Sequence, residues 1–309
     1  SGAGTLAYSL AMREIAKGCA STAVTMSVTN MVGEVIATFG NDAQRKAWCP
    51  RLAAGEHGAF ALSEVGAGSD PGGMATQAVQ DGDEWVLNGT KQWISHGDTA
   101  CVLVVWARTD GPGSRGLSCF LVPGDAPGLK VAKHEDKMGL RASHTVGLEL
   151  DDVRVPASAM LSDRGAGFRI AMMALDGGRI GIASQAVGIA EGALDAAFAD
   201  VLHPSLPQGK LFRVADLRTR LDAAALLTMR AAGQKERGEV FTREASIAKA
   251  FATEAAWKSC NELVEVAGEV ALRTGHAIDR ALRDVRVTMI YEGTSEVQRI
   301  VISRIALSS

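Results

Sequence analysis

The sequence has little of what marks nucleic-acid-binding, membrane or exported proteins. Its 309 residues carry 32 lysines and arginines against 35 acidic residues. A net charge of −3 therefore gives no electrostatic case for nucleic-acid binding. No apolar stretch is long and charge-free enough to cross a bilayer. Residues 1–4, Ser-Gly-Ala-Gly, do not form a basic leader before an apolar core, so we expect no export signal.

Cysteine and histidine are also scarce. The five cysteines are scattered and include no Cys-x-x-Cys pair. An odd, dispersed set favours reduced thiols in a cytoplasmic chain, or in the mitochondrial matrix if the source is eukaryotic. The six histidines include no pair at metal-ligand spacing, so we expect no zinc site. With 47% apolar residues the chain can bury a large core, and we expect two or three subdomains.

Local periodicity divides the chain into three parts. Apolar residues recur at helical intervals over residues 5–39, and Gly40-Asn41-Asp42 predicts a stop and a cap before a short helix through Ala53. Short strands separated by Gly and Pro turns follow from 59 to 162. From Gly165 to the end the pattern is again helical, interrupted at residues 203–207. Helices, strands and then helices indicate an α+β fold, with domains at 1–58, 59–163 and 164–309.

The strands of the middle part are predicted to form an antiparallel β domain. Asn88-Gly89 predicts a hairpin turn between Glu84–Leu87 and Lys91–Ile94. Further strands are expected at 100–107, 117–122, 129–134 and 145–150.

Residues 289–299 contain the most informative turn. Glu292 precedes Gly293, which lets the backbone approach a ligand closely, and Thr294 or Ser295 is placed to cap a following helix. A carboxylate there is suited to act as a base, or it belongs to an ordinary capping turn.

A second segment, residues 60–70, is rich in glycine and serine. A dinucleotide-binding motif is excluded because Pro71 occupies the place of its third glycine and no βαβ unit surrounds it. A serine hydrolase is excluded because the chain has no Gly-x-Ser-x-Gly elbow. The loop can cradle a flavin edge or a phosphate with backbone N–H groups, or it is a plain turn between subdomains.

Together with Trp93-Ile94-Ser95 and the run Leu175–Gln185, these two segments resemble the acyl-CoA dehydrogenase family. The four segments occur in order and at family-like spacing, and Leu175–Gln185 is most similar to the short-chain, butyryl-type branch. The resemblance implies a shortened N-terminal helical domain, a middle antiparallel β-barrel and a C-terminal helical bundle. It also implies FAD as cofactor and oxidation of acyl-CoA thioesters.

The resemblance also implies roles for individual residues. Those expected to bind the cofactor are Phe60, Leu62, Ser63, Gly68, Ser69, Trp93, Ile94, Ser95, Thr294, Ser295 and Glu296. Those expected near acyl-CoA are Ser69, Asp176, Arg179 and Gly293. Two of these assignments have plain alternatives: Trp93 can pack on the barrel, and Asp176 with Arg179 can form an ordinary helix ion pair.

Glu292 is implied to be the catalytic base that takes the α proton of the thioester. Burial should raise its pKa and suit it to that task. Isovaleryl-type and long-chain branches carry their base immediately before the arginine that matches Arg179. This chain has Gly178 there, which leaves Glu292 as the candidate.

The chain departs from the family in three places. About seventy residues of the first helices are not present in this sequence, and an Arg-x-x-Phe-Gly motif is not found after Ala199. Glu265–Glu269 stands where Gln-x-x-Gly-Gly is expected, and a carboxylate there would repel a pyrophosphate. In the family, both of these motifs contact the FAD of a neighbouring subunit. Their alteration suggests a heteromer with a related subunit as an alternative to the usual homotetramer.

Three functional alternatives follow. A dehydrogenase would pass electrons to an electron-transfer flavoprotein, an oxidase would pass them to oxygen, and a cofactor-poor scaffold subunit would do neither. The sequence does not fix the length of the acyl chain.

Overall fold

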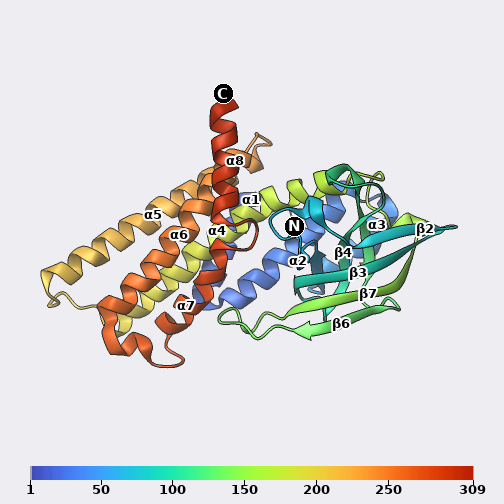
Figure 1. The fold of residues 1–309 in the computed structure, drawn as a ribbon. Helices are drawn as coiled ribbons and strands as arrows, with labels where there is room; N and C mark the ends of the chain where they lie inside the picture. Colours follow the sequence, from blue (N-terminus) through green and yellow to red (C-terminus); the bar gives the residue numbers. More distant parts are fainter. Residues whose placement is uncertain (1, 309) are drawn as a thin grey trace. The chain divides into compact units, whose positions relative to one another are not determined.

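The computed structural model describes residues 2–308. They divide into two compact units, and each is described here by itself. Unit 1 comprises the residues up to Val24, Lys137–Ala142 and the chain from Leu175 onward. Unit 2 comprises Thr25–Asp136 and Ser143–Ala174. Figure 1 traces the elements along the chain.

The chain begins with helices α1 (Gly4–Gly18) and α2 (Ala20–Phe39). They occupy the predicted helical stretch, but Cys19 adopts an extended backbone and divides it in two. Helix α3 (Asp42–Ala53) begins as predicted: the Asn41 side chain accepts a hydrogen bond from the Gln44 N–H, and the Gln44 side chain accepts one from the Asn41 N–H. This reciprocal capping satisfies two N–H groups that have no partner inside the helix.

Unit 2 is built around one seven-stranded sheet. Its path is β1-β4-β2-β3-β7-β6, and β5 pairs with β4. Most pairs are antiparallel as predicted, but β1 lies parallel to β4, and β2 makes one parallel pairing with β4. The strands are β1 (His57–Ala61), β2 (Gln77–Asp81), β3 (Glu84–Ser95), β4 (Ala100–Arg108), β5 (Leu117–Pro123), β6 (Leu129–His134) and β7 (Thr145–Pro156).

The predicted hairpin at Asn88-Gly89 is wrong. These two residues lie inside the continuous strand β3, and the turn falls at Gly82-Asp83, between β2 and β3. Gly82 has φ +60°, which suits a tight turn. Gly89 has a different role: a Cβ there would lie 2.5 Å from Thr76 Oγ1, so glycine permits close approach of the two segments.

The core of the sheet consists of large apolar side chains from facing strands. Trp85, Leu103, Phe120 and Leu148 are almost fully buried there. Trp106 is also fully buried, and its Nε1 donates to the Gly167 carbonyl at 2.8 Å. Three short 3-10 helices lie in the connections, at Pro71–Gly73, Ser114–Gly116 and Ala157–Ala159.

Unit 1 is helical. It contains part of α4 (Gly167–Asp200) together with α5 (Gln208–Glu236), α6 (Thr242–Ala267), α7 (Ala277–Val285) and α8 (Ser295–Ser308). Two 3-10 helices, η4 (Gly268–Leu272) and η5 (Arg286–Met289), flank α7. The predicted interruption at 203–207 separates α4 from α5. No helix within residues 2–308 is long and apolar enough to cross a membrane.

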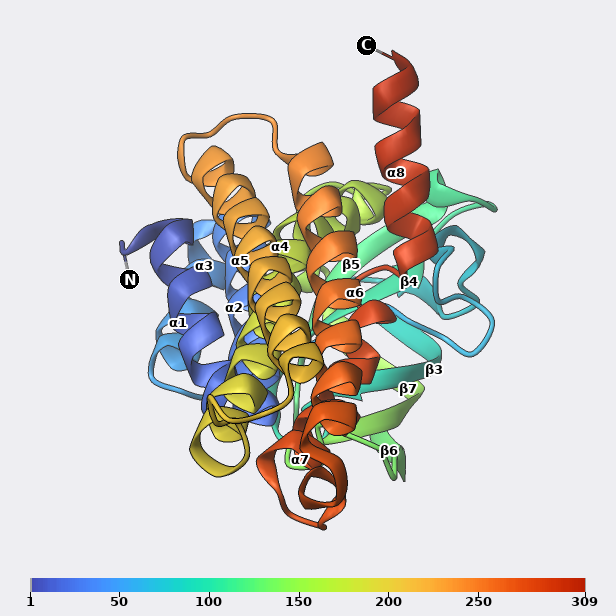
Figure 2. The same cartoon turned by 90° about the vertical axis from the view of Figure 1, so that its left-hand side faces the viewer.

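Small side chains let these helices pack closely. Helices α5 and α6 lie side by side in Figure 2. Their buried alanines form one core cluster with Ile180, Ala183 and Val187 of α4. On α4, a Cβ at Gly188 would lie 2.1 Å from the Arg13 carbonyl oxygen of α1, and a Cβ at Gly192 would lie 2.4 Å from that of Lys17. This close packing fixes which faces of α4 and α6 lie against neighbouring helices.

Candidate active site

The Glu292 turn joins η5 to α8 and has an unusual backbone. Glu292 has φ +54° and Gly293 has φ +86°, so two consecutive residues occupy the left-handed region. A non-glycine residue there is uncommon, and such residues cluster at functional sites. The cap of α8 is supplied by Thr294, whose Oγ1 accepts from the Val297 N–H at 3.3 Å. The Glu292 carboxylate therefore does not serve as the cap.

The carboxylate of Glu292 points into protein rather than into solvent. Its Oε2 is buried and has no hydrogen-bond partner within residues 2–308. A Cβ built on Gly178 would lie 2.6 Å from this Oε2, so the carboxylate rests against the bare backbone of α4. Gly178 thus leaves open the space that the Glu292 carboxylate occupies.

Two cations lie near this carboxylate. Burial raises the pKa of Glu292 to about 7, while the charges of Lys249 and Arg179 oppose that rise. Burial also lowers the pKa of Lys249 to about 8, although the Glu292 charge favours its protonated form. A carboxyl group that titrates near neutral pH can both accept and release a proton under ordinary conditions.

Asp176 and Arg179 form the helix ion pair that the sequence left open. Arg179 Nη1 donates to Asp176 Oδ1 at 2.5 Å and to Ser246 Oγ at 3.1 Å. The Thr242 hydroxyl donates to the other carboxylate oxygen of Asp176 at 2.7 Å. Arg179 is only 5% exposed, so this is a buried network that links α4 to α6.

Three residues around Glu292 were not predicted. Lys249 Nζ donates to the Gly293 carbonyl at 2.6 Å. Gln298 Nε2 donates to the same carbonyl at 2.9 Å and to the Glu292 carbonyl at 3.3 Å. The hydroxyl of Tyr291 donates to the side-chain oxygen of Gln185, and its burial raises the pKa of Tyr291. The available signal for Lys249 was a single cation in the apolar run Ser246–Ala252.

The predicted flavin loop belongs to unit 2 and starts at the end of β1. The Phe60 ring packs on Trp106 at 4.3 Å between centroids, and Leu62 is buried. The Ser63 carbonyl accepts from the Gln92 N–H at 2.9 Å. Beyond this anchored part the loop is open: Gly68 and Ser69 are exposed, and a Cβ at Gly68 would meet nothing within 4 Å.

A buried ion pair between Lys91 and Glu64 anchors this loop to strand β3. Lys91 Nζ lies 2.8 Å from Glu64 Oε1 and 3.2 Å from the Leu62 carbonyl oxygen. The Glu64 carboxylate also accepts from the backbone N–H groups of Ala75 and Thr76 at 2.6 and 3.1 Å. The pair thus joins β3, the loop and the segment before β2.

Trp93 is not packed into the sheet. Its backbone has φ +64°, and the residue is 59% exposed, whereas Ile94 is 1% exposed and Ser95 is partly buried. A large aromatic ring held out on a left-handed backbone is suited to stack on a flat apolar group. These features of unit 2 fit a flavin ring.

The start of α8 in unit 1 carries the polar residues that the family resemblance assigns to the cofactor. Ser295 Oγ is buried without a hydrogen-bond partner in the described part of the chain. Glu296 is exposed, and hydrogen bonds from its own backbone N–H and from Thr294 lower its pKa.

The two carboxylates at the altered Gln-x-x-Gly-Gly motif differ in their partners. Glu265 pairs with Arg213 at 2.6 Å. Glu269 is 90% exposed at its side chain and lies 3.9 Å from Arg273. The Arg213 cation offsets the negative charge at position 265, so the repulsion expected for a pyrophosphate is weaker there than the sequence indicated.

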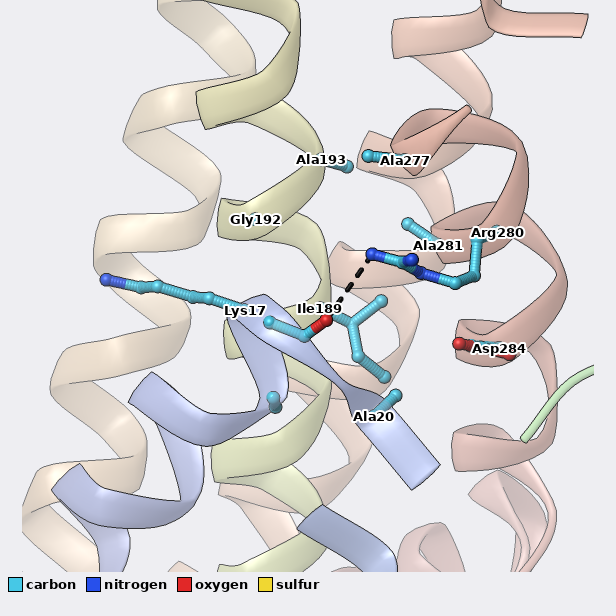
Figure 3. Close-up of a pocket in the computed structure, with 11 residues that line it drawn as sticks. Lys17, Ala20, Ile189, Gly192, Ala193, Ala277, Arg280, Ala281 and Asp284 are labelled. Atoms are coloured by element: carbon cyan, nitrogen blue, oxygen red, sulfur yellow. Dashed lines mark hydrogen bonds between the residues drawn. The ribbon is translucent and has the colours of Figure 1, made fainter. Parts of the chain in front are cut away.

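A small pocket of unit 1 lies among α1, α4 and α7 (Figure 3). Arg280 extends across it and donates to the Gly18 carbonyl at 3.3 Å. Asp284 at its edge accepts from the Leu140 N–H at 2.6 Å. None of the predicted site residues lines this pocket.

Comparison with known proteins shows to which protein family the chain belongs. Family profiles described as the N-terminal, middle and C-terminal domains of acyl-CoA dehydrogenase match residues 1–56, 59–153 and 165–307. The chain belongs to the acyl-CoA dehydrogenase family. Its members are FAD-dependent oxidoreductases, so the chain is a member of an enzyme family of known chemistry.

Several similar proteins belong to the short-chain and butyryl-type branch of the acyl-CoA dehydrogenase family. The short-chain specific acyl-CoA dehydrogenase of Bos taurus mitochondria is 47% identical over all of this chain and 78% of its own length. Butyryl-CoA dehydrogenase of Megasphaera elsdenii is 39% identical with a TM-score of 0.96, over 99% of this chain and 83% of that one. A chain from a solved structure described as electron transferring flavoprotein of Acidaminococcus fermentans has a TM-score of 0.97 and 38% identity, over 100% and 84%.

Proposed function

We propose that this acyl-CoA dehydrogenase family member converts an acyl-CoA thioester to the trans-2-enoyl-CoA, with Glu292 as the base. The observation that carries the proposal is the Glu292 carboxylate. Its Oε2 is buried and has no hydrogen-bond partner among residues 2–308, it lies against Gly178, and burial raises the pKa of Glu292 to about 7. A buried carboxylate oxygen that accepts no hydrogen bond is costly to a fold, and buried acids with a strongly raised pKa are frequent at catalytic sites.

In the proposed reaction Glu292 takes the α proton of the thioester at a carboxylate oxygen. The α C–H is a weak acid, so the negative charge that develops on the thioester oxygen must be stabilised by donors. The backbone N–H of Glu292 is the donor that this chain supplies, as in the family. FAD, when bound, would supply the oxidant for the hydride equivalent that the β carbon loses.

Each of the two units carries residues that we propose contact FAD. In unit 2 these are Phe60, Leu62 and Ser63, the open residues Gly68 and Ser69, and the segment Trp93-Ile94-Ser95. In unit 1 they are Thr294, Ser295 and Glu296. The exposed Trp93 ring is the observation that supports this assignment.

The substrate proposed is a short, straight acyl-CoA of the butyryl type. The run Leu175–Gln185 and the short-chain relatives support it. Ser69, Asp176, Arg179 and Gly293 are proposed to lie near the acyl-CoA, with Asp176 and Arg179 acting through their buried network. Turnover of a series of acyl-CoA chain lengths with an artificial electron acceptor would test this. A preference for long chains would contradict it.

The decisive test of the base is Glu292→Gln in the FAD-loaded protein. We expect loss of α,β-dehydrogenation by at least about a thousandfold, with FAD still bound, because the amide cannot accept the proton. Glu14→Gln is the matched control, since its side chain is an exposed acid of unit 1, 66% exposed. Normal turnover by Glu292→Gln would contradict the assignment.

We further propose an electron-transfer flavoprotein as the electron acceptor. Reduction of that flavoprotein without hydrogen peroxide would support a dehydrogenase, whereas stoichiometric peroxide would identify an oxidase. For assembly, we propose a homotetramer or a heteromer with a related subunit. Size-exclusion chromatography with flavin absorbance separates these: a yellow homo-oligomer with one FAD per chain excludes the heteromer, and a colourless one supports the scaffold alternative.

A further inference from the structure

Lys249 is a buried cation that the reaction as proposed does not use. It lies on α6 among buried alanines, and its side chain is fully buried. A lysine in such a place must be paired or hydrogen-bonded, because an isolated buried charge is strongly unfavourable. Its Nζ donates a hydrogen bond to the Gly293 carbonyl, 2.6 Å away, on the residue directly after Glu292.

The Gly293 carbonyl is held from two sides. Lys249 reaches it from α6 with a charged donor, and Gln298 reaches it from α8 with a neutral one. The turn they hold contains the two left-handed residues Glu292 and Gly293. A strained turn of this kind persists when surrounding groups fix it. The two donors therefore act on the backbone that aims the Glu292 carboxylate.

The charged groups that act on Glu292 and Lys249 belong to α4, α6 and α8. Lys249 of α6 and Arg179 of α4 are the cations that act on its carboxylate. Arg179 is itself bonded to Asp176 and Ser246. Three anions act on Lys249, namely Glu292 itself, Glu296 of α8 and Glu254 of α6. Of these two cations, Lys249 donates a hydrogen bond to the Glu292 turn, whereas Arg179 donates to Asp176 and Ser246.

We propose that Lys249 is a positioning residue for the dehydrogenation: its ammonium group holds the Glu292 turn through the Gly293 carbonyl and keeps a positive charge beside the Glu292 carboxylate. This inference rests on the proposed role of Glu292 as the base. The hydrogen bond aims the carboxylate, and the charge favours its ionised form, which is the form that can accept a proton.

The two parts of this role can be separated because Gln298 offers a neutral match. Lys249→Met removes both the hydrogen bond and the charge, whereas Gln298→Met removes only hydrogen bonds to the same turn. We expect both to lower kcat more than they raise KM, because both loosen the turn. Only Lys249→Met should move the acid limb of the kcat–pH profile, upward by about one pH unit or more. Lys249→Arg, which keeps the charge, should leave that limb within a few tenths of a unit.

A second readout does not depend on turnover. The protonated carboxyl band of Glu292 can be followed by infrared difference spectroscopy against pH, with Glu292→Gln as the subtraction reference. We expect its midpoint to rise in Lys249→Met and to stay in Gln298→Met. If Lys249→Met does not fold, Lys249→Gln serves as the variant that removes the charge.

Two results would overturn the inference: an unchanged Glu292 midpoint and acid limb in Lys249→Met, or an equal shift in Gln298→Met. Failure of the proposed function looks different, because Glu292→Gln would then retain turnover whatever Lys249 does. A profile that shifts only with loss of the lysine charge, in a protein that Glu292→Gln inactivates, supports both.

Discussion

The carboxylate of Glu292 lies against the α-carbon of Gly178, so closely that a Cβ atom there would come within 2.6 Å of Oε2. The two residues are far apart in sequence: Gly178 is a helical residue of α4 without a side chain, and Glu292 is the proposed base. Because residue 178 has no side chain, the Glu292 carboxylate can occupy the space beside this part of α4.

Gly178→Ala should lower activity with little effect on stability. The atoms that the new methyl meets are the end of a flexible side chain, so the carboxylate can move aside at small cost in folding free energy. Moving it by about 1 Å should reduce kcat by roughly tenfold to a hundredfold. Gly33→Ala is the control, because that helical position has only an ordinary contact, 3.8 Å from Leu52. Unchanged kcat in Gly178→Ala would contradict the proximity argument.

Glu292→Gln should be more stable than the parent at high pH. The fold raises the pKa of Glu292 to about 7, so the stability linked to its protonated form is full below the ordinary pKa of a glutamate and is lost as pH rises through about 7. Glutamine mimics the protonated acid at every pH. Thermal unfolding at pH 8 should show a gain on the order of 2–3 kcal/mol, which should disappear near pH 4. An equal gain at both pH values would show that ionisation is not its cause.

Lys91→Met should be strongly destabilising to unit 2. It leaves the Glu64 carboxylate buried without its cation, which typically costs about 3–5 kcal/mol. The double variant Glu64→Gln/Lys91→Met should recover part of that loss, since no unpaired charge remains. Urea unfolding midpoints of the two variants and the parent measure the difference, and a double variant that is less stable than Lys91→Met would contradict the account.

Gly89→Ala tests why the Asn-Gly signal was misleading. A Cβ at Gly89 would lie 2.5 Å from Thr76 Oγ1 and 2.7 Å from its Cα, and the residue has φ +151°. Since backbone atoms cannot step aside, we expect a loss of about 1–3 kcal/mol in the free energy of unfolding. Gly73→Ala, where a Cβ meets nothing within 4 Å, should be close to neutral. Equal effects of the two would show that crowding at Thr76 is not the cause.

Local rules predicted the features that depend on neighbouring residues. The cap at Asn41, the interruption at 203–207 and the α+β order of segments were confirmed because capping and periodicity act within a few residues. The hairpin failed because Asn-Gly is compatible with a turn but does not require one. The pairing of β3 with both β2 and β7 holds Asn88 and Gly89 inside a strand, and that pairing is a non-local property.

By itself, the sequence determined the family-like motifs, the left-handed-tolerant glycine after Glu292, and the absence of a side chain at 178. Tertiary structure alone decided what surrounds the carboxylate. Lys249 meets the turn across 44 residues of chain, and Gly178 meets it from another helix. The physical reason is that the pKa of a buried acid depends on desolvation and nearby charge. Both are fixed by which helix faces pack together, and no local pattern of residues specifies that packing.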